Sequence, residues 1–253
     1  MGKLIAVAGK GGTGKTTVAS LVVRHLLATG RTPVLAVDAD PNHTLGEALG
    51  IEVGKTLGSM REEFFGERAK IPAGMSKQSF LERQLHASVI ESQGMDLLVM
   101  GRQEGPGCYC FLNNVLRRFL DTLTGDYAFA VIDNEAGMEH LSRRNTRKID
   151  LLLLVSDQTV KAVRAIGRIA GLAEELELDV RQKLLVLNRS AGADPAELTL
   201  EIERIGLPVA ARLPVDEALQ AADARGHSLL ALPGGSPAMA ALQDLLDRCL
   251  DAN

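Results

Sequence analysis

Residues 9–17, GKGGTGKTT, constrain the fold of this chain more than any other stretch. They have the spacing G-x-x-x-x-G-K-T and lie between the apolar run 4–8 and the helix-forming run 18–23. This strand–loop–helix order predicts a phosphate-binding loop, because glycines let backbone N–H groups converge on phosphate oxygens at a helix N-terminus. We expect Lys15 to reach the β- and γ-phosphates and the Thr16 hydroxyl to bind Mg²⁺. The other predicted nucleotide contacts in the loop are Gly11, Gly12, Thr13, Gly14 and Thr17.

Apolar runs and helical patterns alternate along the whole chain. Such alternation predicts an α/β fold with a mostly parallel sheet covered by helices on both faces. No linker or repeat interrupts it, so we expect residues 1–253 to form a single domain. Residues 43–92 are less regular, and we expect short helices and loops in the stretch from residue 57 to residue 84. The predicted later strands are 33–37, 96–101, 127–132, 151–155, 183–187 and 209–213, and the clearest later helices are 160–176 and 195–205.

The composition narrows the possible partners and the location. The net charge is −4 and the pI is about 5.8, so no basic field favours nucleic acid. No apolar run approaches the roughly 18 residues that a membrane-spanning helix needs, and no signal peptide precedes the first strand. We therefore expect a cytoplasmic protein that binds neither nucleic acid nor membrane.

Carboxylates follow two of the predicted strands. Asp38 and Asp40 come after the strand at 33–37, and Asp133 ends the strand at 127–132. A single aspartate at such a place often only caps the next helix. Carboxylates that face a phosphate loop instead suggest Mg²⁺ or a positioned water between the anions, and an aspartate at a strand end can bind Mg²⁺ directly or through water.

Lys10 places a second lysine in the loop. The pattern G-K-G-G-x-G-K-T-T resembles the deviant Walker A motif of the MinD/ParA/nitrogenase-iron-protein class of ATPases. That resemblance implies a MinD-like P-loop fold that binds and hydrolyses ATP to ADP with Mg²⁺. It also implies a nucleotide-sandwich homodimer in which Lys10 acts across the interface on the partner's nucleotide.

The same resemblance assigns roles at the ends of several strands. Asp40 corresponds to the switch I residue that orients the attacking water, and Asp38 supports the magnesium shell. The sequence D-x-x-A-G at residues 133–137 resembles the Walker B and switch II segment. This implies that Asp133 binds Mg²⁺ directly or through water, and that Gly137 lets the backbone respond to the γ-phosphate. ATPases of this class recognise the adenine base with the residue at the position of Asn188. The amide of an asparagine offers both a hydrogen-bond donor and an acceptor, which suits the edge of a purine. Pro214 and Asp216 match the segment that packs beside the base.

Cys108 and Cys110 form a C-x-C pair after the loop 103–107 and before a predicted helix. In a reducing compartment such a pair is more often a metal or redox site than a disulfide. The alternative is a pair of small buried side chains, although the glycine- and proline-rich loop argues against burial. Two thiolates do not complete a tetrahedral site, but a two-fold dimer would bring four together. We expect Cys249, on an apolar helix face, to lie in the core.

The sequences MGRQEGPGCYC at residues 100–110 and DNEAGMEHL at residues 133–141 resemble the CooC family of accessory ATPases for carbon monoxide dehydrogenase maturation. The resemblance implies a dimeric metallochaperone whose segment around residues 101–120 holds Ni²⁺ or Zn²⁺ on Cys108 and Cys110. Its client would be carbon monoxide dehydrogenase. His140 is an alternative metal ligand, but a structural role is favoured for a lone histidine on a helix.

Two other functions stay open at this point. An electron-transfer ATPase like the nitrogenase iron protein would hold a [4Fe–4S] cluster between subunits, but that class uses cysteines far apart in sequence. A positioning switch of the MinD or ParA kind would bind membrane or DNA. The C-terminal helical segment is amphipathic but acidic, which is unlike a membrane-binding helix.

Overall fold

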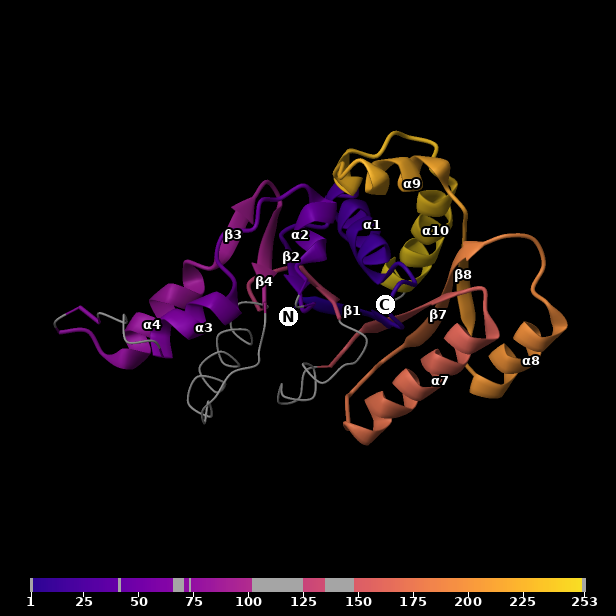
Figure 1. The fold of residues 1–253 in the computed structure, drawn as a ribbon, viewed down its shortest axis with the longest axis horizontal. Coiled ribbons are helices and arrows are strands. Elements are labelled where there is room, and N and C mark those ends of the chain that lie inside the picture. Colours follow the sequence, from indigo (N-terminus) through magenta and orange to yellow (C-terminus); the bar gives the residue numbers. More distant parts are fainter. Residues whose placement is uncertain are drawn as a thin grey trace.

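The apolar runs form the strands of one central sheet, with helices packed against both of its faces (Figure 1). The computed structural model describes residues 2–40, 42–65, 71, 72, 74–101, 125–134 and 148–251. Within that part the sheet has the order β3-β4-β2-β5-β1-β6-β7-β8. Neighbouring strands are parallel except β3 and β4. The strands are β1 Lys3–Gly9, β2 Val34–Asp38, β3 Val89–Ser92, β4 Met95–Val99, β5 Phe129–Asp133, β6 Leu151–Asp157, β7 Lys183–Ser190 and β8 Val209–Pro214.

The central strands are buried along nearly their whole length, as continuous apolar runs in a parallel sheet require. One core cluster packs beneath α1, α2, α9, η1 and α10, and the other beneath α3, α4, α7 and α8. The helices are α1 Lys15–Ala28, α2 Thr44–Leu49, α3 Leu57–Phe65, α4 Lys77–His86, α7 Val160–Glu175, α8 Ala196–Ile205, α9 Glu217–Ala224, the 3₁₀ helix η1 Leu229–Ala231 and α10 Pro237–Asp251. The predicted α/β class and the covered, mostly parallel sheet are confirmed.

The main difference from the sequence prediction lies in residues 43–92. This part contains an antiparallel edge strand, β3, for which the sequence analysis predicted no strand. The strand has four residues, and it pairs with β4 through a tight turn in which Gly94 has a φ of 78°. So short and half-exposed a strand leaves little periodicity to detect.

The order of the strands gathers polar groups at one edge of the sheet. In the register of β2 and β5, Asp38 lies beside Asp133, and Asp133 also pairs with Val7 near the end of β1. The loop that follows β1 therefore emerges beside both carboxylates. Parallel α/β sheets bind ligands at this edge. Among the described residues, no helix combines the length and the apolarity needed to cross a membrane.

Candidate functional site

The phosphate loop connects β1 to α1, and it is held in shape from within and from β7. The Thr13 hydroxyl donates a hydrogen bond to the carbonyl of Lys10 at 2.8 Å, and the Asn188 amide donates to the carbonyl of Thr13 at 2.9 Å. Gly14 begins the helix with a φ of 91°, and a Cβ there would lie 2.2 Å from Asn188 Nδ2. Glycine is therefore required at this position both by the backbone conformation and by the close approach of β7.

Thr16 and Asp133 lie together at the first turn of α1. The Thr16 hydroxyl donates to Asp133 Oδ2 at 2.5 Å and lies 3.2 Å from the Thr44 hydroxyl. Asp133 is buried, and its second oxygen, Oδ1, has no hydrogen-bond partner among the described residues. Burial raises the pKa of Asp133 from 3.8 to about 7, helped by the nearby charge of Asp38 and opposed by the Thr16 hydrogen bond and by Lys15.

The Asp133 oxygen that has no partner in the described part of the chain provides a test of whether Mg²⁺ fits here. A buried carboxylate oxygen without a donor is costly, and a divalent cation bound beside it removes that cost. The Thr16 hydroxyl lies next to it and offers a second oxygen ligand. The donor set is all oxygen, as Mg²⁺ prefers. Thr16 and Asp133 therefore fit the cation, with Asp133 ionised.

Asp38 is held differently from Asp133. Its carboxylate accepts the backbone N–H of Asp40 at 3.0 Å and that of Leu45 at 2.9 Å, and the residue is fully buried. Burial raises the pKa of Asp38, while the two backbone hydrogen bonds oppose the rise. In this structure Asp38 orders the loop between β2 and α2, and its expected support of the magnesium shell stays a prediction.

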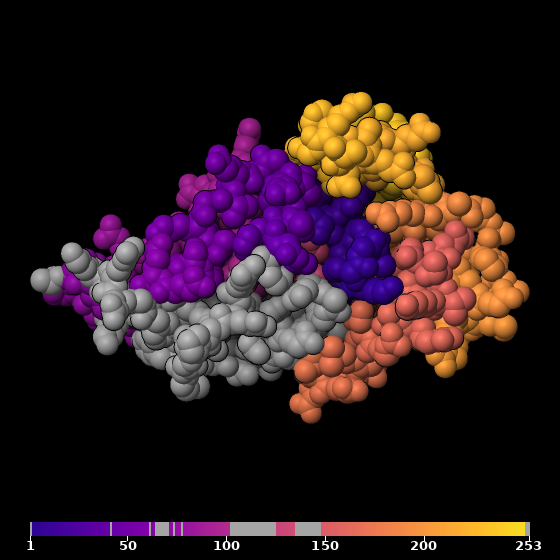
Figure 2. Space-filling model, viewed as in Figure 1, coloured from indigo at the N-terminus to yellow at the C-terminus, as the bar shows by residue number. Residues whose placement is uncertain are grey.

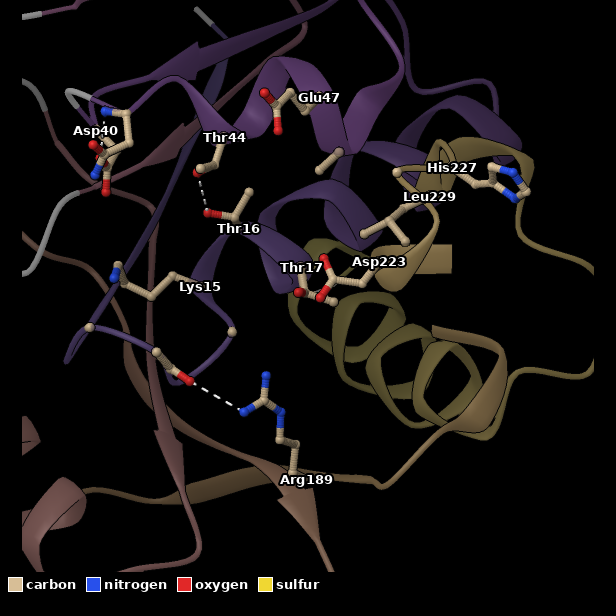
Figure 3. A pocket seen from close by; sticks show the side chains of 16 residues that line it. Lys15, Thr16, Thr17, Asp40, Thr44, Glu47, Arg189, Asp223, His227 and Leu229 are labelled. Carbon is tan, nitrogen blue, oxygen red and sulfur yellow. Dashed lines mark hydrogen bonds between the residues drawn. The ribbon is translucent and has the colours of Figure 1, made fainter. Parts of the chain in front are cut away.

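A cavity of about 460 Å³ opens at the phosphate loop (Figure 3). In Figure 2 the N-terminal part of the chain, coloured indigo, reaches the surface of the molecule. It lies there between the violet segment that follows it in the sequence and the orange and yellow parts near the C-terminus. Most of the predicted contacts in the phosphate loop line the cavity, and so does Asp40; the loop residues are Gly11, Gly12, Gly14, Lys15, Thr16 and Thr17. Thr13 is instead buried beneath the loop, where its hydroxyl holds the loop closed.

Sequence reasoning missed the residues on the opposite wall of the cavity. Arg189 follows Asn188, has a φ of 54° and donates weakly to the carbonyl of Gly12 at 3.4 Å. Within the described part of the chain, its other guanidinium donors have no hydrogen-bond acceptor and can meet an anionic ligand in the cavity. Other missed wall residues come from α2, from the end of α9 and from the segment that follows it, and the sequence carries no local motif for them; they include Thr44, Glu47, Asp223 and His227.

The residues predicted to read the base do not line this cavity. Asn188 is buried, with one amide hydrogen on the phosphate loop and its oxygen accepting the N–H of Arg189. Asp216 caps α9 through Ala218 and Leu219 and also accepts from Ser236 and Ala238 near the start of α10. Pro214 ends β8. In this structure the side chains of Asn188 and Asp216 form hydrogen bonds within the protein that hold its own elements together. Contacts with the base by these two residues and by Pro214 stay predictions.

Lys10 lies outside the nucleotide cavity of its own chain. Its side chain is exposed and borders a separate hollow of about 240 Å³ together with Ala165, Ile169 and Leu172 of α7. This position agrees with a lysine that does not bind its own chain's nucleotide, but action across a dimer is not tested by a single chain.

The predicted metal site cannot be placed, because Cys108, Cys110, Gly137 and His140 lie outside the described residues. Within the described ranges, no cluster of three or more His, Cys, Asp or Glu side chains is arranged to hold a metal. Cys249 is partly exposed and packs against the core cluster beneath α1 and α10. The prediction that Cys249 lies in the core is therefore only partly right.

Comparison with known proteins agrees with this site. Residues 4–230 match the CbiA family, described as the CobQ/CobB/MinD/ParA nucleotide binding domain. An uncharacterised ATP-binding protein of Methanocaldococcus jannaschii is 38% identical over 250 residues, which is 98% of each chain. The carbon monoxide dehydrogenase accessory protein CooC of Rhodospirillum rubrum is 30% identical over 236 residues, 88% of each chain.

Solved structures agree on the fold. The cell division ATPase MinD of Pyrococcus furiosus superimposes with a TM-score of 0.70 over 100% of both chains, at 21% identity. At that identity the likeness concerns the architecture alone. The matched family, the phosphate loop and the Thr16–Asp133 pair lead to the same conclusion. The chain belongs to the CobQ/CobB/MinD/ParA family of nucleotide-binding domains and is an ATP-binding P-loop protein of the MinD/ParA type.

Proposed function

We propose that this chain hydrolyses Mg²⁺-ATP as a homodimer and serves as a metallochaperone that assists nickel insertion into carbon monoxide dehydrogenase. The observation that carries the metal half is the 30% identity to the CooC protein together with the C-x-C pair at Cys108 and Cys110. The more similar archaeal relative has no characterised role, so the cargo and the client depend on these two facts.

The ATP half depends on the geometry around the phosphate loop. Lys15 and the loop N–H groups neutralise and orient the phosphates, and Thr16 and ionised Asp133 hold Mg²⁺. The cation supplies positive charge where the phosphate oxygens become more negative. Asp40 lies on the cavity wall and orients a water. The water oxygen bonds to the γ-phosphorus as the bond to the β-phosphate oxygen breaks, and the water's proton passes to the released phosphate.

Dimerisation completes both halves of the proposal. Lys10 is exposed and outside its own cavity, so it is available to the nucleotide of a second copy. Two copies bring four thiolates from Cys108 and Cys110 to one site, which satisfies the coordination of Ni²⁺ or Zn²⁺. Thiolate ligands alone do not decide between these two ions.

Phosphate release measures ATP hydrolysis, and light scattering with ADP or a non-hydrolysable ATP analogue measures dimerisation. Lys15→Ala should lose nucleotide binding. Lys10→Ala should still bind ADP, because Lys10 does not line the cavity, but should lose turnover and the ATP-dependent dimer. Turnover at the wild-type rate in Lys10→Ala would contradict action across the interface.

The metal half is tested by metal analysis of the dimer fraction. We expect about one Ni²⁺ or Zn²⁺ per dimer, set by a four-ligand site. Cys108→Ala combined with Cys110→Ala should lose this metal while ADP binding persists, and Cys249→Ala is the matched control that should keep it. Unchanged stoichiometry in the double variant would refute the site.

Separate measurements test the proposed client enzyme and the two alternative functions. Purified nickel-free carbon monoxide dehydrogenase should gain activity faster with the chain, nickel and ATP than with nickel alone. Iron and sulfide in the anaerobically purified dimer would instead favour the electron-transfer function. ATP-dependent sedimentation with liposomes or DNA would favour the positioning function.

A further inference from the structure

Arg189 reaches the nucleotide cavity from an unusual backbone conformation. Its φ is 54°, in the left-handed region that non-glycine residues seldom adopt, and the pairing of β7 with β8 shifts register between Leu187 and Ser190. In Figure 3 its guanidinium points toward the phosphate loop, where the hydrogen bond to the carbonyl of Gly12 is long, at 3.4 Å. So long a bond is too weak to fix the side chain. The orientation of Arg189 therefore depends on the chain on either side of it.

The backbone before Arg189 is fixed, whereas the loop after it has little packing of its own. On the near side, the side-chain oxygen of Asn188 accepts the N–H of Arg189 at 3.0 Å. On the far side, residues 191–193 are two alanines and a glycine, and all three are exposed. Small exposed side chains gain little from burial, so the position of this loop depends on polar contacts from other elements.

Gln158 makes two of these contacts with a single side-chain amide. It directly follows β6, whose last residue pairs with Asn188 in the register of β6 and β7. Its oxygen accepts the N–H of Ala191 and its nitrogen donates to Asp194 Oδ1, both at 2.8 Å. The first of these bonds holds the backbone two residues beyond Arg189. Left-handed strain at a non-glycine residue persists only where such contacts impose it.

Asp194 attaches the same loop to the last strand of the sheet. Its second carboxylate oxygen accepts a hydrogen bond from Arg212 of β8, and its side chain is only 10% exposed. The bond from Arg212 lowers the pKa of Asp194, burial opposes this change, and the bond from Gln158 lowers the pKa further. An ionised carboxylate accepts stronger hydrogen bonds than a neutral group. Gln158 and Asp194 together therefore hold the loop against β6 and β8.

These side chains lie outside the nucleotide cavity. Within the described part of the chain, the cavity is lined by Arg189 but by none of Gln158, Asp194 and Arg212. Any effect of these three on nucleotide binding must therefore pass through the loop and Arg189.

We propose that Gln158 and Asp194 are positioning residues that hold the loop after β7 so that the guanidinium of Arg189 faces the phosphates of the bound nucleotide. The inference rests on the proposed function in requiring that a nucleoside phosphate occupies the cavity beside Arg189. A side chain that is oriented before the ligand arrives loses less conformational freedom on binding, which improves affinity.

A double-mutant cycle on ADP affinity, measured by calorimetry with the full chain, tests the proposal. Gln158→Ala should weaken ADP binding about threefold to tenfold, within the range by which residues of one hydrogen-bond network are coupled. In an Arg189→Ala background the same substitution should change the affinity by less than about twofold, because the side chain that it positions is already absent. A role in stability alone would lower the affinity equally in both backgrounds.

Asp194→Asn provides a second cycle and guards against a folding defect, since asparagine keeps the size of the side chain but not its charge. It should show the same pattern with a smaller loss. Gln182→Ala is the matched control, because it makes the same change at an exposed residue directly before β7. It should leave the ADP affinity unchanged in both backgrounds.

Equal losses from Gln158→Ala with and without the Arg189 side chain would overturn the proposal, and so would wild-type affinity in Gln158→Ala or in Arg189→Ala. The cycle uses ADP and no transition metal, so it does not depend on hydrolysis or on the cargo. A failure of the proposed function shows separately, in the phosphate release and the metal stoichiometry of the wild-type protein.

Discussion

Replacing Asp133 with asparagine should stabilise the nucleotide-free protein while damaging its response to Mg²⁺. The carboxyl of Asp133 is buried beside Asp38, and burial raises its pKa from 3.8 to about 7. Folding at pH 8 therefore requires an ionised carboxylate in a place that disfavours its charge. Asparagine has nearly the same shape, can accept the hydrogen bond from Thr16 and carries no charge.

The size and sign of the effect follow from the pKa. Because the folded pKa lies above the unfolded value, Asp133 favours folding when protonated, and its penalty grows as the pH rises from about 4 through about 7. The penalty that the variant removes is about 2 kcal/mol at pH 5 and about 4 kcal/mol at pH 8. The difference in unfolding free energy between variant and wild type should thus grow by about 2–3 kcal/mol between these pH values.

Urea unfolding followed by far-UV circular dichroism measures this difference, since the chain has no tryptophan for fluorescence. Asp179→Asn, at an exposed site, is the control and should show a difference that does not vary with pH. With saturating Mg²⁺-ADP the wild type should become more stable than the Asp133→Asn variant, because bound Mg²⁺-ADP stabilises the wild type through Asp133 and does not stabilise the variant in this way. A pH-independent difference for Asp133→Asn would refute the electrostatic reasoning.

Three further substitutions test the structure of the site. Gly14→Ala brings a Cβ within 2.2 Å of Asn188 Nδ2 and should lower ADP affinity in calorimetry by tenfold or more, about 1.4 kcal/mol. The control is Gly54→Ala, at a position that does not line the cavity and where a Cβ would meet nothing within 4 Å, and it should change the affinity little. Arg189→Ala should weaken ADP binding by about tenfold, as expected for one charge-assisted hydrogen bond, and wild-type affinity would exclude Arg189 from the nucleotide site. Asp216→Ala removes the cap of α9 and should cost about 1–2 kcal/mol in urea unfolding at pH 7. Loss of ADP binding beyond that destabilisation would instead support a base contact by Asp216.

The sequence alone predicted the parts of this protein that depend on short stretches of chain. The phosphate loop is specified by residues 9–17, and its glycines have the positive φ values at Gly12 and Gly14 that such a loop requires. The long apolar runs predicted the central strands, because strands buried on both faces need no polar alternation. The four-residue β3 was missed because its length and exposure give no such pattern.

Only the tertiary structure decided how distant groups meet. Thr16 and Asp133 are 117 positions apart, and Asn188 reaches Thr13 across 175 positions. Nothing local in the sequence indicates that one oxygen of Asp133 lacks a partner among the described residues, while Asp38 has both of its oxygens engaged by backbone N–H groups. Burial and partners, which set the pKa and the capacity to bind a cation, depend on the neighbours that the whole sheet brings together.

The conformation of the phosphate loop was thus determined by its own residues. The residues that form the cavity wall facing the loop could not be identified from any local stretch of sequence. Arg189 lies opposite the loop because β7 lies two strands from β1, with β6 between them. Other missed wall residues come from α2, from the end of α9 and from the segment that follows it. A local motif fixes its own backbone through φ and hydrogen bonds within a few residues. The shape and charge of a cavity between elements depend on strand order, and strand order is decided by the burial of the whole core.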